Sequence, residues 1–222
     1  MALLVQNGGG NTLNNTNVPK AFASNVTAGN LIIVGQTIDS ASDIATAPTD
    51  SLGNTYVNAT KRLGASVSSY VWYAENIAGG ACTVTAHTSS TVGQTMGIAE
   101  VSGEATSSSL GAVQTNTEND TAAPSVAATA PTAGMAFGVL ATTTAETITP
   151  EGTWTQIYEQ ESYAIMTGSH IVKVVTSGSQ TASWSLGTTS NCRTCIAIFK
   201  DAAGGGGLSI PVAIKHYRSL RA

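Results

Sequence analysis

The feature that most constrains the fold is a succession of short runs rich in Val, Ile, Thr and Tyr, separated by clusters of Gly, Asn, Asp and Ser. Apolar residues rarely recur at helical spacing, whereas alternation of apolar and polar residues is common, so the pattern predicts an all-β protein. Ten strands need two packed sheets or a barrel, and we predict a two-sheet β-sandwich of jelly-roll type. The expected strands are residues 30–37, 55–62, 69–75, 81–87, 95–102, 134–142, 153–160, 164–175, 181–186 and 192–200.

A weak internal repeat relates the two halves of the chain at an offset of about one hundred residues. Residues 29–35 (GNLIIVG) align with residues 133–139 (AGMAFGV), and residues 97–102 (GIAEVS) align with residues 195–200 (CIAIFK). Two similar five-strand halves would pack face to face as one sandwich. Halves this rich in Gly and Thr can also align by chance, and in that case the sandwich prediction is unchanged.

The repeat and the composition divide the chain into five segments. Residues 1–27 are expected to form an N-terminal arm and a first strand, and residues 28–106 and 132–200 the two halves of the sandwich. The stretch 107–131 between the halves is rich in Thr, Ala, Ser and Asn and is interpreted as a linker. Residues 201–222 include four consecutive glycines, which make a flexible tether, and are interpreted as a C-terminal arm.

Beyond the tetraglycine, the C-terminal arm has an apolar strip followed by a basic tip. An extended strip can add as a strand to the sheet edge of another subunit, with the basic residues paired to acidic groups there. The alternative is a frayed terminus. The residues predicted to bind a partner chain are Leu208, Ile210, Val212, Ile214, Tyr217, Arg218 and Arg221.

Composition narrows the classes of partner. Charged residues make up only 10% of the chain, against about 25% in ordinary proteins. The 42% of hydrophobic residues and the formal net charge of -4 exclude disorder driven by charge. Basic residues are few before the last ten positions, so we expect no direct contact with nucleic acid. The sequence lacks the pattern of a signal peptide or of a membrane span, so we expect synthesis in a cytoplasm and no membrane partner.

No arrangement of residues typical of a metal or nucleophilic site is recognised. Cys192 and Cys195 have a spacing that zinc sites use, and the other candidate metal ligands are His87, His170 and His216, but no second pair of ligands has a similar spacing. Three positions along a strand also place two side chains on opposite faces, so we expect both cysteines to pack in the interior. The three histidines lie in no catalytic motif, and no Gly-x-Ser-x-Gly turn occurs. We predict neither enzymatic activity nor a bound cofactor.

Acidic residues are the remaining candidates for chemistry. Two well-placed carboxylates hydrolyse glycosidic bonds, and several carboxylates bind calcium, but the regular spacing of a calcium loop is missing. Solvated loop acids are the expected interpretation, with a hydrolase as a third-ranked function. The residues concerned are Asp39, Asp43, Asp50, Glu100, Glu104, Glu118 and Asp120, of which the first three are the candidate calcium ligands.

Tyr70 and Trp72 are a candidate platform for a sugar. They lie two positions apart on one predicted strand and therefore share a face of the sheet. Carbohydrate-binding sandwiches stack sugar rings on exposed aromatic side chains. The alternative is that both residues fill the core of a protein that has only three Phe.

The sequence resembles the jelly-roll or β-sandwich domains that occur repeatedly in virion proteins of tailed phages. The resemblance covers roughly residues 28–200 and consists of turn and core signatures, without catalytic residues. The arm after the tetraglycine has no counterpart in it. The matching segments are 28–34 (AGNLIIV), 50–56 (DSLGNTY), 71–80 (VWYAENIAGG), 99–103 (AEVSG) and 196–200 (IAIFK).

The resemblance implies a virion structural protein, and we expect a capsid decoration (cement) protein that stabilises the shell through oligomeric packing and terminal arms. The expected partners are further copies of the chain, as in a trimer, and other virion proteins such as the major capsid protein. The expected location is the virion, after synthesis in the host cytoplasm. The alternative function is a carbohydrate-binding or adhesin module of a phage tail or fibre.

Overall fold

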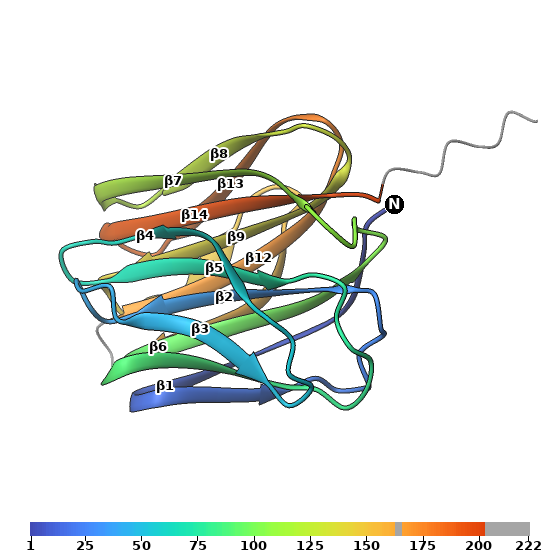
Figure 1. Cartoon of the computed structure of the whole chain (residues 1–222). Coiled ribbons are helices and arrows are strands. Elements are labelled where there is room, and N and C mark those ends of the chain that lie inside the picture. The colour runs from blue at the N-terminus through green and yellow to red at the C-terminus, as the bar shows by residue number, and fades with distance from the viewer. Residues whose placement is uncertain (163–165, 203–222) are drawn as a thin grey trace, which may run out of the picture.

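The computed structural model describes residues 1–162 and 166–202 (Figure 1). These residues contain strands, turns and loops, which confirms the all-β prediction, and they include no helix long and apolar enough to cross a membrane. The first half contains β1 (Leu3–Ala21), β2 (Leu31–Ile38), β3 (Ala45–Asp50), β4 (Val57–Arg62), β5 (Ser68–Ala74) and β6 (Thr83–Ser102). The second half contains β7 (Leu110–Thr121), β8 (Ser125–Ala130), β9 (Gly134–Thr142), β10 (Ile148–Pro150), β11 (Thr155–Ser162), β12 (Met166–Val175), β13 (Gly178–Leu186) and β14 (Ser190–Lys200).

In the first half, the two longest strands wrap around the strands between them. β1 and β6 pair antiparallel along their whole lengths, from Leu3 opposite Ser102 to Ala21 opposite Thr83. One end of this pair of strands belongs to the sheet β1-β6-β2-β5-β4. At the other end of the pair, β6 also pairs with β3. The half is therefore a sandwich of a five-stranded and a three-stranded layer. A long antiparallel pair of strands whose two ends lie in the two layers of a sandwich is the wrapping pattern of a jelly roll.

The second half repeats this order with separate strands. Its sheets have the orders β7-β14-β9-β12-β11 and β8-β13-β10, so β7 and β8 take the places of the two ends of β1. The pairing register agrees with the sequence repeat. Gly35 lies opposite Gly97, and their aligned counterparts Val139 and Cys195 also lie opposite each other. The repeat is confirmed, with eight strand segments in each half instead of the five predicted.

The two five-stranded sheets pack face to face, and the three-stranded layers cover their outer faces. Figure 1 shows the resulting stack, from β8 and β13 at the top to β1 and β3 at the bottom. β1 packs against β11, and their counterparts β7 and β4 also pack against each other. The pairs β6–β12 and β14–β5 are related in the same way. The halves are thus related by an approximate twofold axis between β2 and β9.

Burial on both faces explains why the central strands are continuously apolar in sequence. In β2, Ile32 and Val34 enter the core of the first half, whereas Leu31 and Ile33 enter the interface between the halves. β9 is buried along its whole length in the same way. Burying each side chain of this size contributes about 1.5–3 kcal/mol, so the interface stabilises both halves together.

One predicted segment has a different structure from the one expected. The linker, residues 107–131, contains β7 and β8, whereas residues 1–27, expected to form an arm and a first strand, are mostly the paired strand β1. The predicted strands 81–87 and 95–102 are the two ends of the single strand β6. Thr, Asn and Gly dominate β1 and β7, so their alternation of apolar and polar residues is weak. β1 and β7 are held in their sheets by backbone hydrogen bonds to β6 and β14, respectively, rather than by the burial of one apolar face.

Candidate functional site

Tyr70 and Trp72, the predicted sugar platform, share a face of β5 as expected, but that face is turned inward. Tyr70 is 0% exposed and Trp72 is 8% exposed, and both belong to the core of the first half. Their rings stack with centroids 6.2 Å apart and 10° between their planes. The Tyr70 hydroxyl donates to Asp43 Oδ1 at 3.3 Å. Neither ring offers a free face to a sugar, so the core-packing alternative describes this pair.

Cys192 and Cys195 point to opposite faces of β14, as their spacing predicts. Cys192 lies in the core of the second half, and Cys195 lies in the interface between the halves. Both thiols are free, and burial raises the pKa of each to about 12. Over residues 1–162 and 166–202, no three His, Cys, Asp or Glu side chains gather to hold a metal ion. The candidate calcium ligands Asp39, Asp43 and Asp50 are therefore not brought together in such a group.

His170 is a fully buried polar residue of the interface. His170 packs from β12 against Gly35 and Gly97, where an added Cβ atom would clash with its Nδ1 and its Cβ, respectively. Nε2 lies 3.0 Å from Thr95 Oγ1, which lies 2.7 Å from Thr37 Oγ1. Burial lowers the pKa of His170 to about 3, so the ring is neutral at neutral pH. The two glycines make room for this ring, and His170 joins the two halves rather than facing a substrate.

Two acidic residues, Glu75 and Glu100, hold loops in place. Glu100 is buried in β6, and its carboxylate accepts hydrogen bonds from Thr27 N at 2.8 Å and Asn30 Nδ2 at 2.6 Å. Glu75 follows β5 and accepts a hydrogen bond from Ser109 N at 2.6 Å. That bond ties the first half to the segment that leads into β7. Both carboxylates are occupied by structural hydrogen bonds.

Asp50 closes the turn after β3. Its Oδ1 accepts hydrogen bonds from the backbone amides of Leu52 and Asn54, and its Oδ2 accepts from Asn54 Nδ2 and the Tyr56 hydroxyl. We expect Asp50→Asn to lower the free energy of unfolding by about 1–2 kcal/mol, because an amide cannot accept all four bonds. Urea denaturation measures this loss, with Asp120→Asn as the control at an exposed acid. Equal stability of the two variants would contradict a clamping role for Asp50.

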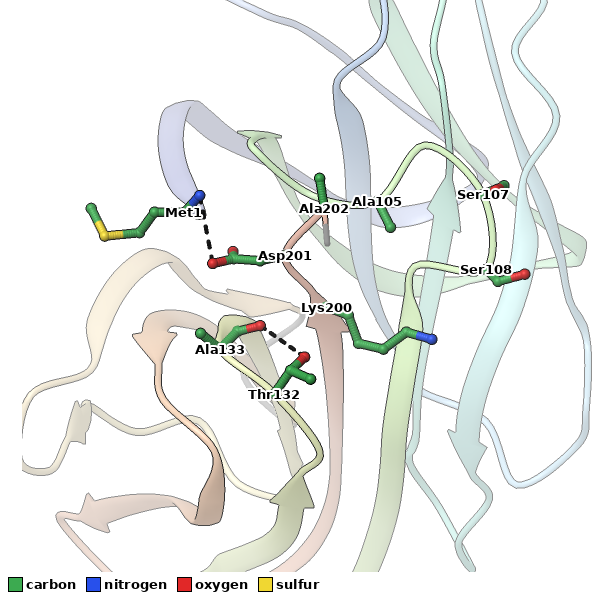
Figure 2. Close-up of a pocket in the computed structure, with 9 residues that line it drawn as sticks. All are labelled: Met1, Ala105, Ser107, Ser108, Thr132, Ala133, Lys200, Asp201 and Ala202. Atoms are coloured by element: carbon green, nitrogen blue, oxygen red, sulfur yellow. Dashed lines mark hydrogen bonds and ion pairs between the residues drawn. The ribbon is translucent and has the colours of Figure 1, made fainter. Parts of the chain in front are cut away.

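A hollow of about 490 Å³ lies at the end of the sandwich where the described chain ends (Figure 2). Four segments meet there: the start of β1, the segment between the halves, the loop before β9 and the end of β14. Because Ala202 lies on its rim, the C-terminal arm begins at this hollow. The lining residues are Met1, Ala105, Ser107, Ser108, Thr132, Ala133, Lys200, Asp201 and Ala202.

Beside the hollow, Glu104 forms an antiparallel bridge with Asp201. Glu104 is 5% exposed, and neither of its carboxylate oxygens has a hydrogen-bond partner in the part of the chain that the structure describes. Asp201 Oδ1 accepts from Ala2 N at 2.5 Å, and Oδ2 lies 3.6 Å from the amino group of Met1. Burial, and then the charge of Asp201, raise the pKa of Glu104 to about 8. Sequence reasoning placed Glu104 among solvated loop acids, because nothing local shows that distant segments bury it.

The residues predicted to bind a partner lie outside the described part of the chain: Leu208, Ile210, Val212, Ile214, Tyr217, Arg218 and Arg221. Their charge is still informative. Three of the nine basic residues and none of the thirteen acidic residues lie in 203–222, so that segment carries +3. Six basic and thirteen acidic residues remain in 1–202, which therefore carries a formal charge of -7.

The chain was also compared with known proteins. Comparison with protein-family models, with curated proteins and with solved structures finds no match. Its function is therefore inferred from the charge, burial and strand pairing described above.

Proposed function

We propose that this chain is a structural protein that assembles with copies of itself through its C-terminal arm, and that it serves in a virion as a capsid decoration protein. The observation that carries the proposal is the separation of charge between residues 1–202, at -7, and residues 203–222, at +3. Opposite charge attracts the arm of one copy to the body of another and speeds their encounter. In the sequence, four glycines at positions 204–207 separate the body from the apolar strip of the arm.

The body of the molecule suits a structural role under mechanical stress. Its two central sheets are covered on both faces, and the two halves share the apolar interface around Phe137 and Val139. Closely packed interiors of this kind resist deformation. The virion setting rests on the resemblance to phage jelly-roll domains and on a surface poor in charge, and the major capsid protein is the proposed shell partner.

Deletion of residues 203–222 is expected to abolish assembly and shell binding without unfolding the body, because residues 1–202 contain the paired strands of both halves and the apolar cores that hold them together. Light scattering gives the mass of the full chain and of the shortened chain, and thermal melting checks the fold. The assembly of the full chain should also weaken as salt rises, since salt screens exposed charges. A shortened chain that keeps the wild-type mass and the wild-type occupancy on shells would contradict the proposal.

The carbohydrate-binding alternative depended on an exposed aromatic platform. Tyr70 and Trp72 lie in the core of the first half, so the feature that motivated this alternative is absent from the described surface at that strand. We therefore propose the assembly function alone.

A further inference from the structure

One edge of the first five-stranded sheet is unpaired and uncharged. β1 pairs with β6 on one side, and between Leu3 and Gly10 no strand of the described residues pairs with its other side. Residues 3–19 contain no charged side chain. After a bulge at Val5, the strand runs in regular register from Gln6 to Gly10. The free backbone N–H and C=O groups of such an edge are a template for another strand.

The other three edges of the central sheets carry charged residues. β4 contains Lys61 and Arg62, β7 contains Glu118 and Asp120, and β11 contains Glu159. Charged side chains on an edge strand discourage the addition of a further strand. A basic arm is also repelled by Lys61 and Arg62. Among these four edges, β1 is therefore the least protected.

The place where the arm leaves the body determines whether it can pair favourably with β1 of its own copy or with β1 of another copy. Asp201 is bonded to Ala2, so the arm leaves the molecule at the end where β1 begins. Running along its own β1, the arm would pair in parallel, which is less favourable per residue than antiparallel pairing. Every strand pair among the described residues is antiparallel. A second copy can present its β1 in the antiparallel direction.

The arm also has the composition of an outermost strand. Pro211 has no backbone N–H, and proline within a sheet is found on edge strands, where one side needs no partner. Resting on the proposed function, we infer that residues 208–214 of one copy add as an antiparallel strand to the β1 edge of a second copy, at residues 3–10. Because each copy has one arm and one free β1 edge, a reciprocal or cyclic exchange of arms between copies would close an oligomer.

Two matched lysine substitutions in the full chain test this inference. Asn7 is an exposed residue of β1, and Asn119 is an exposed residue of β7, the counterpart of β1 in the repeat. We expect Asn7→Lys to raise the dissociation constant of the assembly at least tenfold, with the melting temperature unchanged. Asn119→Lys should leave the assembly as in the wild type. Light scattering over a concentration series measures both, beside the chain shortened to Ala202.

The outcomes separate the inference from the proposed function. If the shortened chain is monomeric and Asn7→Lys still assembles as the wild type does, the β1 edge is not the docking site, while arm-mediated assembly stands. If both lysine variants weaken assembly equally, the effect is one of general charge and the inference fails. If the shortened chain assembles normally, both proposals fail. Loss of assembly in Asn7→Lys and in the shortened chain, but not in Asn119→Lys, supports the β1 edge.

Discussion

Replacing Phe137 by Ala is expected to lower the free energy of unfolding by about 3–5 kcal/mol. Phe137 is fully buried in the interface between the halves, where Gly35 makes room for its ring. A Cβ atom at Gly35 would lie only 2.7 Å from Phe137 Cε1. Removing the ring leaves a cavity between two sheets that are both covered on their outer faces, so neither sheet can move in to fill it.

Urea denaturation followed by tryptophan fluorescence measures the effect of Phe137→Ala. Val113→Ala, at an exposed position of β7, is the control and should change the stability by no more than about 0.5 kcal/mol. Phe137→Leu should fall between the two because it retains most of the apolar volume. A loss for Phe137→Ala as small as that of Val113→Ala would contradict the packing of the halves through this interface.

Replacing Glu104 by Gln is expected to raise the free energy of unfolding by about 2–3 kcal/mol at pH 7. The pKa of Glu104 rises from an ordinary value of 4.5 to about 8, because the carboxyl is buried beside Asp201. Between these two pH values the folded chain holds a proton that the unfolded chain has released. The contribution of Glu104 to the stability of the wild type is therefore most favourable below pH 4.5, and it becomes less favourable as the pH rises towards 8.

Glutamine resembles the protonated carboxyl and has no charge to bury, so the variant should lack this dependence on pH. Unfolding measured from pH 4 to pH 9 should show the two proteins converging at the acid end and separating by up to about 1.4 kcal/mol per pH unit above it. Glu151→Gln, at an exposed acid, is the matched control and should follow the wild type. Parallel curves for Glu104→Gln and the wild type would show that Glu104 is not held in its protonated form.

The strands that are clearest in the sequence are those whose side chains are buried on both faces. β2, β9 and β14 are apolar runs in the sequence. The sequence repeat aligns Gly35 with Val139, and these two residues occupy equivalent positions in the two halves of the fold. β3, β7, β8 and β10 escaped prediction as strands, and β1 was expected only as a first strand without bounds, because backbone pairing holds their polar residues in place. Propensity in strands depends on such neighbours, which a single segment of sequence does not reveal.

The sequence by itself determined that the chain is all-β, that it contains two related halves, and that Cys192 and Cys195 lie on opposite faces of one strand. These properties follow from local spacing, since side chains alternate along a strand. Only the tertiary structure decided that Tyr70 and Trp72 face a core, that Glu104 is buried beside Asp201, and that the β1 edge remains unpaired over residues 3–10. Alternation tells which residues share a face, whereas what covers that face depends on segments far away in the chain.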